Sequence, residues 1–159
     1  MDMSDEVTTK SNTGKIIGIG CLVVAFLAVP VIGIIAAIAI PNFVSMQNKT
    51  KAGEIPMNMN AIKVAEISYY SQFDQYVAAD AYPPFVEKQA KIWDGQASGG
   101  FETIGWIPFG NVRGSYSVST THNDFTITGI SDIDGDGINA TYVATSSTNP
   151  TKTTAPDIY

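Results

Sequence analysis

The segment 132–139 holds the densest group of metal-ligating side chains in the sequence. It reads Asp132-Ile133-Asp134-Gly135-Asp136-Gly137-Ile138-Asn139. Carboxylates at alternating positions, followed by a glycine that permits a sharp turn, match the first half of an EF-hand loop, whose oxygen ligands bind calcium. The predicted calcium ligands are Asp132, Asp134, Asp136, Ile138 through its backbone carbonyl, and Asn139.

The rest of the EF-hand pattern is missing. The twelfth position from Asp132 is Val143 instead of a bidentate glutamate, and the flanking residues are typical of strands. A true EF-hand is thereby excluded, and a calcium loop between two strands remains. The alternative is an ordinary Asp/Gly turn, in which these residues are common. Three like charges within five residues repel one another without a cation, which favours calcium.

Other kinds of chemistry find little support in the composition. The chain has 159 residues, of which one is Cys and one is His, so few ligands exist for a His-based metal site or a catalytic triad. The formal net charge is -6 with nine Lys and Arg residues, which argues against nucleic-acid binding. No nucleophile–base pair stands out. We therefore predict that the protein is not an enzyme and does not bind nucleic acid.

The secondary structure that would position the predicted calcium ligands begins with an uncharged run from Ile16 to Ile40. As a helix it would be roughly 37 Å long, enough to cross a hydrocarbon core of about 30 Å. It is longer than the apolar region of a secretory signal peptide. We predict a polar N-terminal tail or leader over 1–15 and a single-pass transmembrane helix over 16–41. Helix kinks are expected at three prolines, Pro30, Pro41 and Pro56.

Beyond the membrane helix, residues 42–78 predict an amphipathic helical half. A spacing of three to four residues relates Met59, Ile62, Glu66, Tyr69, Phe73 and Tyr76 or Val77. Of these, Ile62, Tyr69, Phe73 and Val77 would line one buried stripe, with Glu66 off it or at its edge. A kink or break is expected within 53–56. The helix should end before Tyr82, because Pro83 disfavours a helical residue before it.

The remaining segments predict a small antiparallel sheet. Residues 79–112 form an aromatic-rich connecting loop with a short helix near 85–93. Residues 113–145 alternate apolar and polar side chains in three runs that flank the Asp-rich loop. Residues 146–159 are rich in Thr, Ser and Pro and predict a flexible tail. The fold class is α+β: a long N-terminal helix packed on a three- to four-stranded antiparallel sheet.

The stretch Gly33-Ile34-Ile35-Ala36-Ala37-Ile38-Ala39-Ile40-Pro41-Asn42-Phe43 resembles the N-terminal helix of type IV pilins and of type II secretion pseudopilins. The resemblance extends to about Val77, and beyond it only the order of elements matches. It implies a subunit that polymerises through its apolar helix after a prepilin peptidase removes a leader that ends in Gly. The filament assembly platform is a further implied partner.

The processing site departs from the family pattern. Its leader Gly would correspond to Gly20, which makes Cys21, instead of Phe, the first mature residue. The fifth mature residue would be Ala25, or Val24 in the alternative register, instead of Glu, and residues 7–53 contain no Glu. The chain either stays uncut or is an atypical or minor subunit.

The leading functional hypothesis is a structural subunit of a type IV pilus-like or pseudopilus filament with a calcium-stabilised globular head. The implied partners are copies of itself or homologous subunits and membrane lipid. The basic residues close to the two ends of the membrane helix are equal in number, with Lys10 and Lys15 before it and Lys49 and Lys51 after it. The composition of the C-terminal domain places it outside the cytoplasmic (inner) membrane or on an extracellular filament. The alternative is a stand-alone single-pass membrane protein whose extracytoplasmic domain binds a ligand or partner.

Overall fold

The computed structural model describes residues 13–94 and 99–159, and for residues 13–25 and Leu27 it describes the backbone alone. The chain divides into two compact units, and the second one, Ser45–Tyr159, is called the head below. The predicted leader, 1–15, lies almost entirely outside the described residues.

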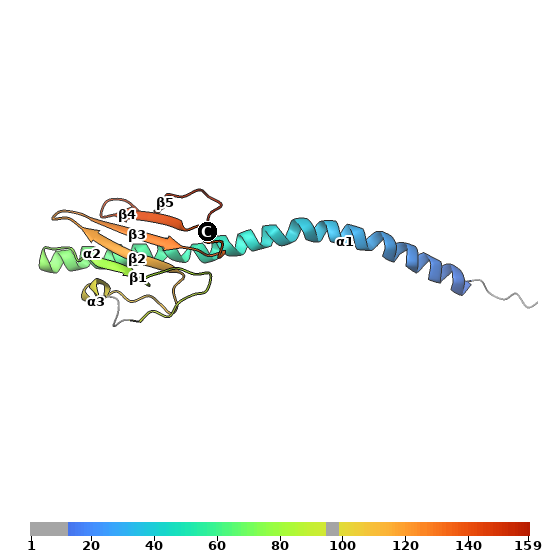
Figure 1. Ribbon diagram of the computed structural model, residues 1–159, viewed down its shortest axis with the longest axis horizontal. Coiled ribbons are helices and arrows are strands. Elements are labelled where there is room, and N and C mark those ends of the chain that lie inside the picture. Colours follow the sequence, from blue (N-terminus) through green and yellow to red (C-terminus); the bar gives the residue numbers. More distant parts are fainter. Residues whose placement is uncertain (1–12, 95–98) are drawn as a thin grey trace, which may run out of the picture. The chain divides into compact units, whose positions relative to one another are not determined.

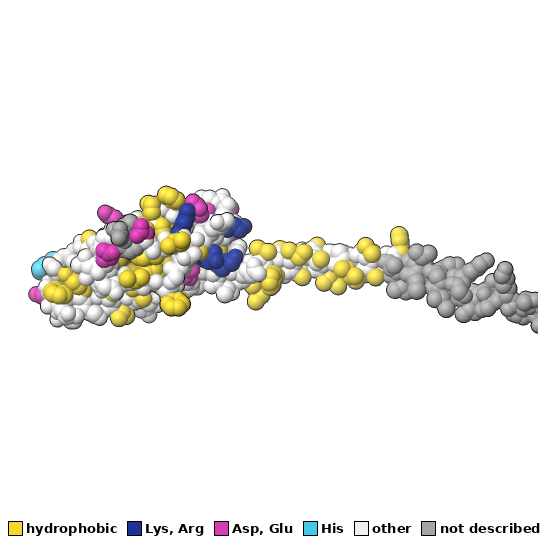
Figure 2. All heavy atoms as spheres, turned by 90° about the horizontal axis from the view of Figure 1, so that it is seen from below, with side chains coloured by type: hydrophobic (Ala, Val, Ile, Leu, Met, Phe, Trp, Pro, Cys, Tyr) yellow, Lys and Arg dark blue, Asp and Glu magenta, His cyan; other side chains and the backbone are white. Residues whose placement is uncertain are grey.

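Helix α1 spans Thr13–Ala52 and contains the segment predicted to cross a membrane. Its described large apolar side chains are exposed, for example Phe26 at 82% and Ile35 at 60%. Figure 2 shows hydrophobic side chains along the described part of this helix before the head and no charged ones. Within the described residues, the helical stretch Ala28–Phe73 is long and apolar enough to cross a membrane. Pro30 and Pro41 lie inside α1, and the kinks expected there stay predictions.

Helix α2, Glu54–Phe73, follows α1 after the single residue Gly53. The backbone of Gly53 stays in the right-handed helical region (φ -59°, ψ -20°), and its N–H donates to the carbonyl of Lys49 at 3.1 Å. Pro56 has no N–H to donate to the carbonyl of Ala52, four residues earlier, so one helical hydrogen bond is missing at this point. The interruption therefore falls within 53–56 while the chain keeps its helical path.

The buried stripe of α2 differs from the predicted one. Ile55, Met59, Ile62 and Glu66 are fully buried, at intervals of four, three and four residues. Of the predicted stripe, only Ile62 belongs to this set, and Phe73 is 57% exposed. The prediction was wrong because it placed the large aromatic side chains in the core and left out the charged Glu66.

Helix α2 also ends earlier than predicted, at Phe73. The next residue, Asp74, adopts a left-handed conformation (φ 55°), and its N–H donates to the carbonyl of Tyr70 at 2.8 Å. This conformation closes the last helical turn and reverses the chain. Residues 74–78, which the prediction placed in the helix, therefore lie outside it.

The sheet has five antiparallel strands in the order β1-β2-β3-β4-β5 (Figure 1). The strands are β1 (Ala79–Tyr82), β2 (Gly114–Thr120), β3 (Phe125–Ser131), β4 (Ala140–Thr145) and β5 (Thr151–Lys152). Strands β2, β3 and β4 are the three predicted runs, and β1 and β5 extend them at the two edges. Helix α2 packs against β2, β3 and β4. The predicted α+β fold, a long helix on an antiparallel sheet, is confirmed.

Two glycines let α2 approach the sheet closely. A Cβ atom at Gly129 of β3 would lie 2.7 Å from Sδ of Met59 and 2.9 Å from Cγ2 of Ile55. A Cβ atom at Gly114 of β2 would lie 2.5 Å from Cδ1 of Ile55. The helix therefore rests on the strand backbones at these two positions, and any side chain there would push the two layers apart.

The connecting segment 83–112 folds over the sheet edge at β1. Its short helix is α3, Gly100–Thr103, and residues 85–93 are not helical, contrary to the prediction. Trp93 contacts three aromatic rings edge to face, those of Tyr82, Phe101 and Trp106, at centroid distances of 4.9, 5.5 and 5.0 Å. These contacts join the loop to the hydrophobic core of the head, to which Phe101 and Trp106 belong.

The segment 146–159, predicted to be a flexible tail, is held at several points. Residues Thr151 and Lys152 form β5 and pair with Val143 and Tyr142 of β4. Further along, the carbonyl of Tyr159 accepts a hydrogen bond from the N–H of Ile133 at 2.8 Å. The composition of the segment did not reveal these backbone contacts.

Candidate functional site

The loop between β3 and β4 brings three predicted ligands together. One carboxylate oxygen from each of Asp132, Asp134 and Asp136 lies within 4.8 Å of the others. The loop turns sharply because Gly135 and Gly137 adopt positive φ angles of 76° and 83°, which side chains disfavour. Three converging carboxylates are the kind of oxygen-rich group that binds calcium.

The hydrogen bonds of the loop leave one buried carboxylate oxygen without a partner. Both oxygens of Asp132 accept backbone N–H groups, from Gly135 at 2.8 Å and from Gly137 at 3.2 Å. Oδ1 of Asp136 accepts the N–H of Ile138 at 2.7 Å. By contrast, Oδ1 of Asp134 is buried and has no hydrogen-bond partner. A bound cation would satisfy this oxygen.

The two remaining predicted ligands are exposed. Asn139 lies with Asp132 on a hollow of about 390 Å³, and Ile138 is 55% exposed. The aliphatic part of Lys88 covers the loop, because a Cβ atom at Gly135 would lie 3.1 Å from Cβ of Lys88. The geometry thus brings the three aspartates together, and the coordination expected of Ile138 and Asn139 stays a prediction.

A second carboxyl group, which the sequence did not single out, lies in the head's interior. Glu66 is completely buried, and its Oε2 accepts the N–H of Val77 at 3.0 Å. Its Oε1 has no hydrogen-bond partner. Burial raises the pKa of Glu66 from 4.5 to about 6, and the Val77 hydrogen bond partly opposes this rise. An isolated glutamate on a helix gives no sequence signal that distinguishes such a buried group from a surface one.

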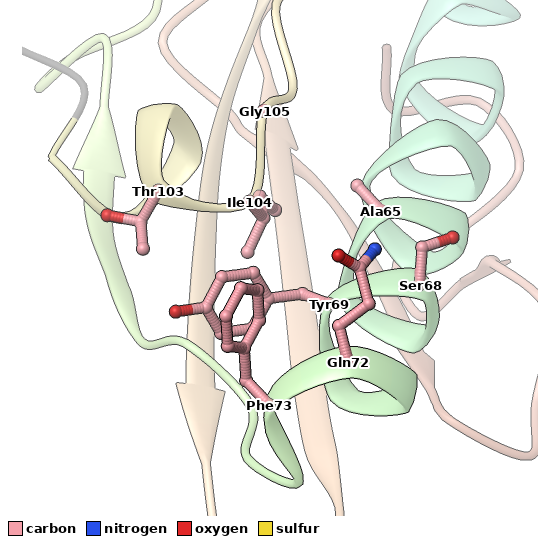
Figure 3. Close-up of a pocket in the computed structure, with 8 residues that line it drawn as sticks. All are labelled: Ala65, Ser68, Tyr69, Gln72, Phe73, Thr103, Ile104 and Gly105. Atoms are coloured by element: carbon pink, nitrogen blue, oxygen red, sulfur yellow. The ribbon is translucent and has the colours of Figure 1, made fainter.

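A hollow of about 450 Å³ lies between the C-terminal part of α2 and the segment after α3. Figure 3 shows the rings of Tyr69 and Phe73 side by side near Ile104, and their centroids are 4.4 Å apart. The hollow is lined by Ala65, Ser68, Tyr69, Gln72, Phe73, Thr103, Ile104 and Gly105. The lining has no carboxylate, imidazole, thiol or lysine, so the phenol of Tyr69 is the one side chain in it that belongs to the usual general acids and bases.

The described part of α1 before the head presents apolar side chains on all its sides. Ile34, Ile35, Ile38 and Ile40 are each exposed by 60% or more, although they point in different directions around the helix. A helix that is hydrophobic all round is suited to lipid or to the interior of a bundle of helices. This surface is a candidate contact site. The backbone of the predicted processing residues, Gly20 and Cys21, is helical, and their side chains lie outside the described residues.

The comparison with curated proteins links the chain to type IV pilins. A stretch of 55 residues is 42% identical to the type IV major pilin protein PilA of Myxococcus xanthus (strain DK1622). The match covers 35% of this chain and 25% of that pilin. No protein-family model matches the chain, and no solved structure matches it. The resemblance to pilins expected from the apolar helix is thereby confirmed, and it supports a structural, membrane-anchored or filament-forming protein.

Proposed function

We propose that the chain is a structural subunit of a type IV pilus-like or pseudopilus filament. The observation that carries this proposal is the apolar surface of α1, which no described part of the chain covers. Such a surface is stable in a bilayer or among similar helices, and it is unstable in water. The partial match to a type IV major pilin supports packing among similar helices as well as insertion in a bilayer.

In this proposal the protein is first a single-pass protein of the cytoplasmic membrane, with its head outside. It then leaves the bilayer when α1 packs among the α1 helices of other copies or of homologous subunits. An assembly platform would drive this transfer, and a prepilin peptidase would cut between Gly20 and Cys21 beforehand. The head would stay exposed on the filament surface.

The direct test is to shear filaments from cells and to determine the N-terminus of the protein by mass spectrometry. The proposal predicts the protein in the sheared fraction. An N-terminus at Cys21 would show leader removal, and one at Met1 would show an uncut subunit. Recovery in the membrane fraction alone, with none in sheared material, would contradict a filament role.

That last outcome would instead support the second candidate, a stand-alone single-pass membrane protein with an extracytoplasmic binding domain. The observation that favours it lies at the processing site. Residues 7–53 contain no Glu, and Cys21 replaces the usual Phe. The two candidates therefore differ in whether the protein leaves the membrane.

We also propose that Asp132, Asp134 and Asp136 bind one calcium ion. The support is the convergence of their oxygens within 4.8 Å and the buried, unpartnered Oδ1 of Asp134. The ion would tie the β3–β4 loop together and stabilise the head, because it would bind the folded state alone.

Thermal melts of the full chain in detergent, with calcium and with chelator, test this second proposal. At a hundredfold excess over Kd, calcium should add about 2.7 kcal/mol, which is roughly 10 °C in Tm for a domain of this size. Asp134→Asn should abolish the difference. Asp80→Asn, at an exposed position of β1, is the matched control and should keep it. Identical melts of the unmodified protein in the two buffers would remove calcium from the proposal.

A further inference from the structure

A hollow of about 250 Å³ lies at the end of the head where the chain passes from α1 into α2. Lys49, Ala52, Gly53 and Pro56 line it from one face of the helical stretch, at positions i, i+3, i+4 and i+7. Tyr142, Lys152, Pro156 and Tyr159 line the opposite side. In Figure 2 the dark blue Lys and Arg side chains gather toward one end of the head.

The hollow is positively charged in a chain whose net charge is -6. Two of its lining residues, Lys49 and Lys152, carry basic side chains, and no lining side chain is acidic. Within the described residues, the ion pairs are Lys91 with Glu87 and Arg113 with Glu54, so neither lysine of the hollow takes part in one. The local field therefore favours an anion.

Lys152 is held firmly in this position. Its Nζ donates to the carbonyls of Pro156 and Ile158 and lies 5.3 Å from the ring centroid of Tyr159. The hydroxyl of Tyr159 is hydrogen-bonded to Oγ of Ser45 at 3.2 Å, one helical turn before Lys49. Lys152 thus contacts carbonyls and a ring, and among the described residues no carboxylate forms an ion pair with it.

The usual structural reason for lysines at a helix end applies poorly here. Basic residues in a last turn stabilise the free carbonyls and the negative end of the helix dipole. Gly53 keeps a helical backbone, however, and its N–H satisfies the carbonyl of Lys49 itself. The helical path continues into α2, so Lys49 faces no open helix end.

If α1 spans a membrane as proposed, Lys49 would lie at the membrane surface. Residues 16–48 carry no charge, so Lys49 is the first charged residue after Lys15. A helix from Lys15 to Lys49 would be roughly 50 Å long, and a bilayer with its headgroup layers is about 40–45 Å thick. With a modest tilt, the two lysines would lie in opposite headgroup layers. Tyrosines such as Tyr142 and Tyr159 are typical of this depth.

We propose that the hollow between Lys49 and Lys152 binds the phosphate of an anionic phospholipid headgroup while α1 spans the membrane. This inference depends on the membrane span included in the proposed function, but not on filament assembly. The bound lipid would hold the base of the head at the bilayer surface, and the subunit would lose this contact when it leaves the membrane.

The test is native mass spectrometry of the full chain in detergent, titrated with phosphatidylglycerol or with phosphatidylcholine. The unmodified chain should bind phosphatidylglycerol selectively, and Lys49→Gln should weaken this binding about fivefold. Lys152→Arg keeps the charge and should bind normally. Lys63→Gln, at a lysine of α2 outside the hollow whose Nζ donates to the carbonyl of Thr148, is the control and should bind like the unmodified chain.

Several results would overturn the proposal. They are equal binding of the two lipids, undiminished binding by Lys49→Gln, or binding of millimolar inorganic phosphate as tight as that of phosphatidylglycerol, so that phosphate displaces the lipid. Formation of dimers in place of lipid adducts would assign the hollow to a second copy and would also overturn it. Fractionation of cells separates this failure from that of the proposed function. A chain that is absent from sheared filaments contradicts the proposed function, whereas a chain found in membranes and in sheared filaments but without lipid selectivity contradicts this inference alone.

Discussion

Glu66 places a carboxyl group in the apolar interior of the head, and it makes the head's stability depend on pH. The group is completely buried with one unpartnered oxygen, and its pKa rises from 4.5 to about 6 because of burial. Between these two values the folded head keeps the proton that the unfolded chain loses. Stability therefore falls as pH rises through this window. The difference between the two pKa values corresponds to about 2 kcal/mol in the free energy of unfolding, and this stabilisation is fully lost above about pH 7.

Glu66→Gln should remove this loss, because a neutral amide needs no proton. In denaturation followed by circular dichroism, the variant should be more stable than the unmodified head at pH 7.5 by about 2 kcal/mol and no more stable at pH 4. Burial also raises the pKa of Glu54. In the Glu66→Gln variant, stability should therefore still fall with rising pH, but with a smaller slope. Glu102→Gln, at an exposed position, is the control. Parallel pH profiles for the Glu66 and Glu102 variants would show that the Glu66 carboxyl does not titrate in this window.

The contact of α2 with the sheet depends on the absence of side chains at Gly114 and Gly129. Ile55 and Met59 occupy the space that a Cβ atom would take at Gly129. The strand alternates buried and half-buried positions from Phe125 to Ser131, so this glycine faces the helix. Helix and sheet therefore meet at van der Waals distance along the middle of β3.

Gly129→Val should destabilise the head by about 1–3 kcal/mol, because the helix must move away from the strand. Thr128→Val, the neighbouring position on the other face of β3, should change stability by less than about 0.5 kcal/mol. Chemical denaturation of both variants in the same detergent measures the two values. Equal stabilities would mean that Met59 and Ile55 repack around the new side chain without loss.

How far the sequence predicted these elements depended on the strength of each local signal. The alternation in 113–145 predicted β2, β3 and β4, because one face of each strand is buried. It gave no indication of β5, since Thr151 and Lys152 are held only by pairing with β4. The end of α2 was missed because Asp74 adopts a left-handed conformation that is rare for residues other than glycine.

The candidate sites also differ in whether a local sequence pattern indicates them. The convergence of the three aspartates follows from their spacing on one tight loop, so the sequence alone indicated it. The basic hollow joins Lys49 of α1 to Lys152 of β5, more than one hundred residues later. No local pattern relates these two residues, and the buried position of Glu66 likewise depends on tertiary packing.

The whole chain combines a helix that needs an apolar environment with a head that folds around its own core. The exposed isoleucines of α1 and the buried stripe of α2 lie on consecutive helices, yet they face different surroundings. The head should therefore fold in solution conditions that α1 cannot tolerate alone. Assembly in the proposed function acts on α1 and leaves the interior of the head unchanged.

A charge in α1 tests this division. Ile35→Arg should disfavour the membrane-inserted state by about 2.5–3.5 kcal/mol and remove the protein from sheared filaments, because an arginine cannot pack among apolar helices. Ile35→Leu keeps the apolar surface and should assemble normally. Quantifying the protein in the membrane fraction and in the sheared filament fraction measures both effects. Normal filaments from the arginine variant would show that this part of α1 is not in their interior.

The aromatic residues of the chain are distributed as unevenly as its charges. Trp93 and Trp106 contact each other within the loop of the head, and α1 contains neither Trp nor Tyr. Intrinsic fluorescence of the intact protein is consequently a signal of the head alone. Loosening of the loop could be followed by the emission of these two indoles in bilayers or in assembled fibres, without any attached dye.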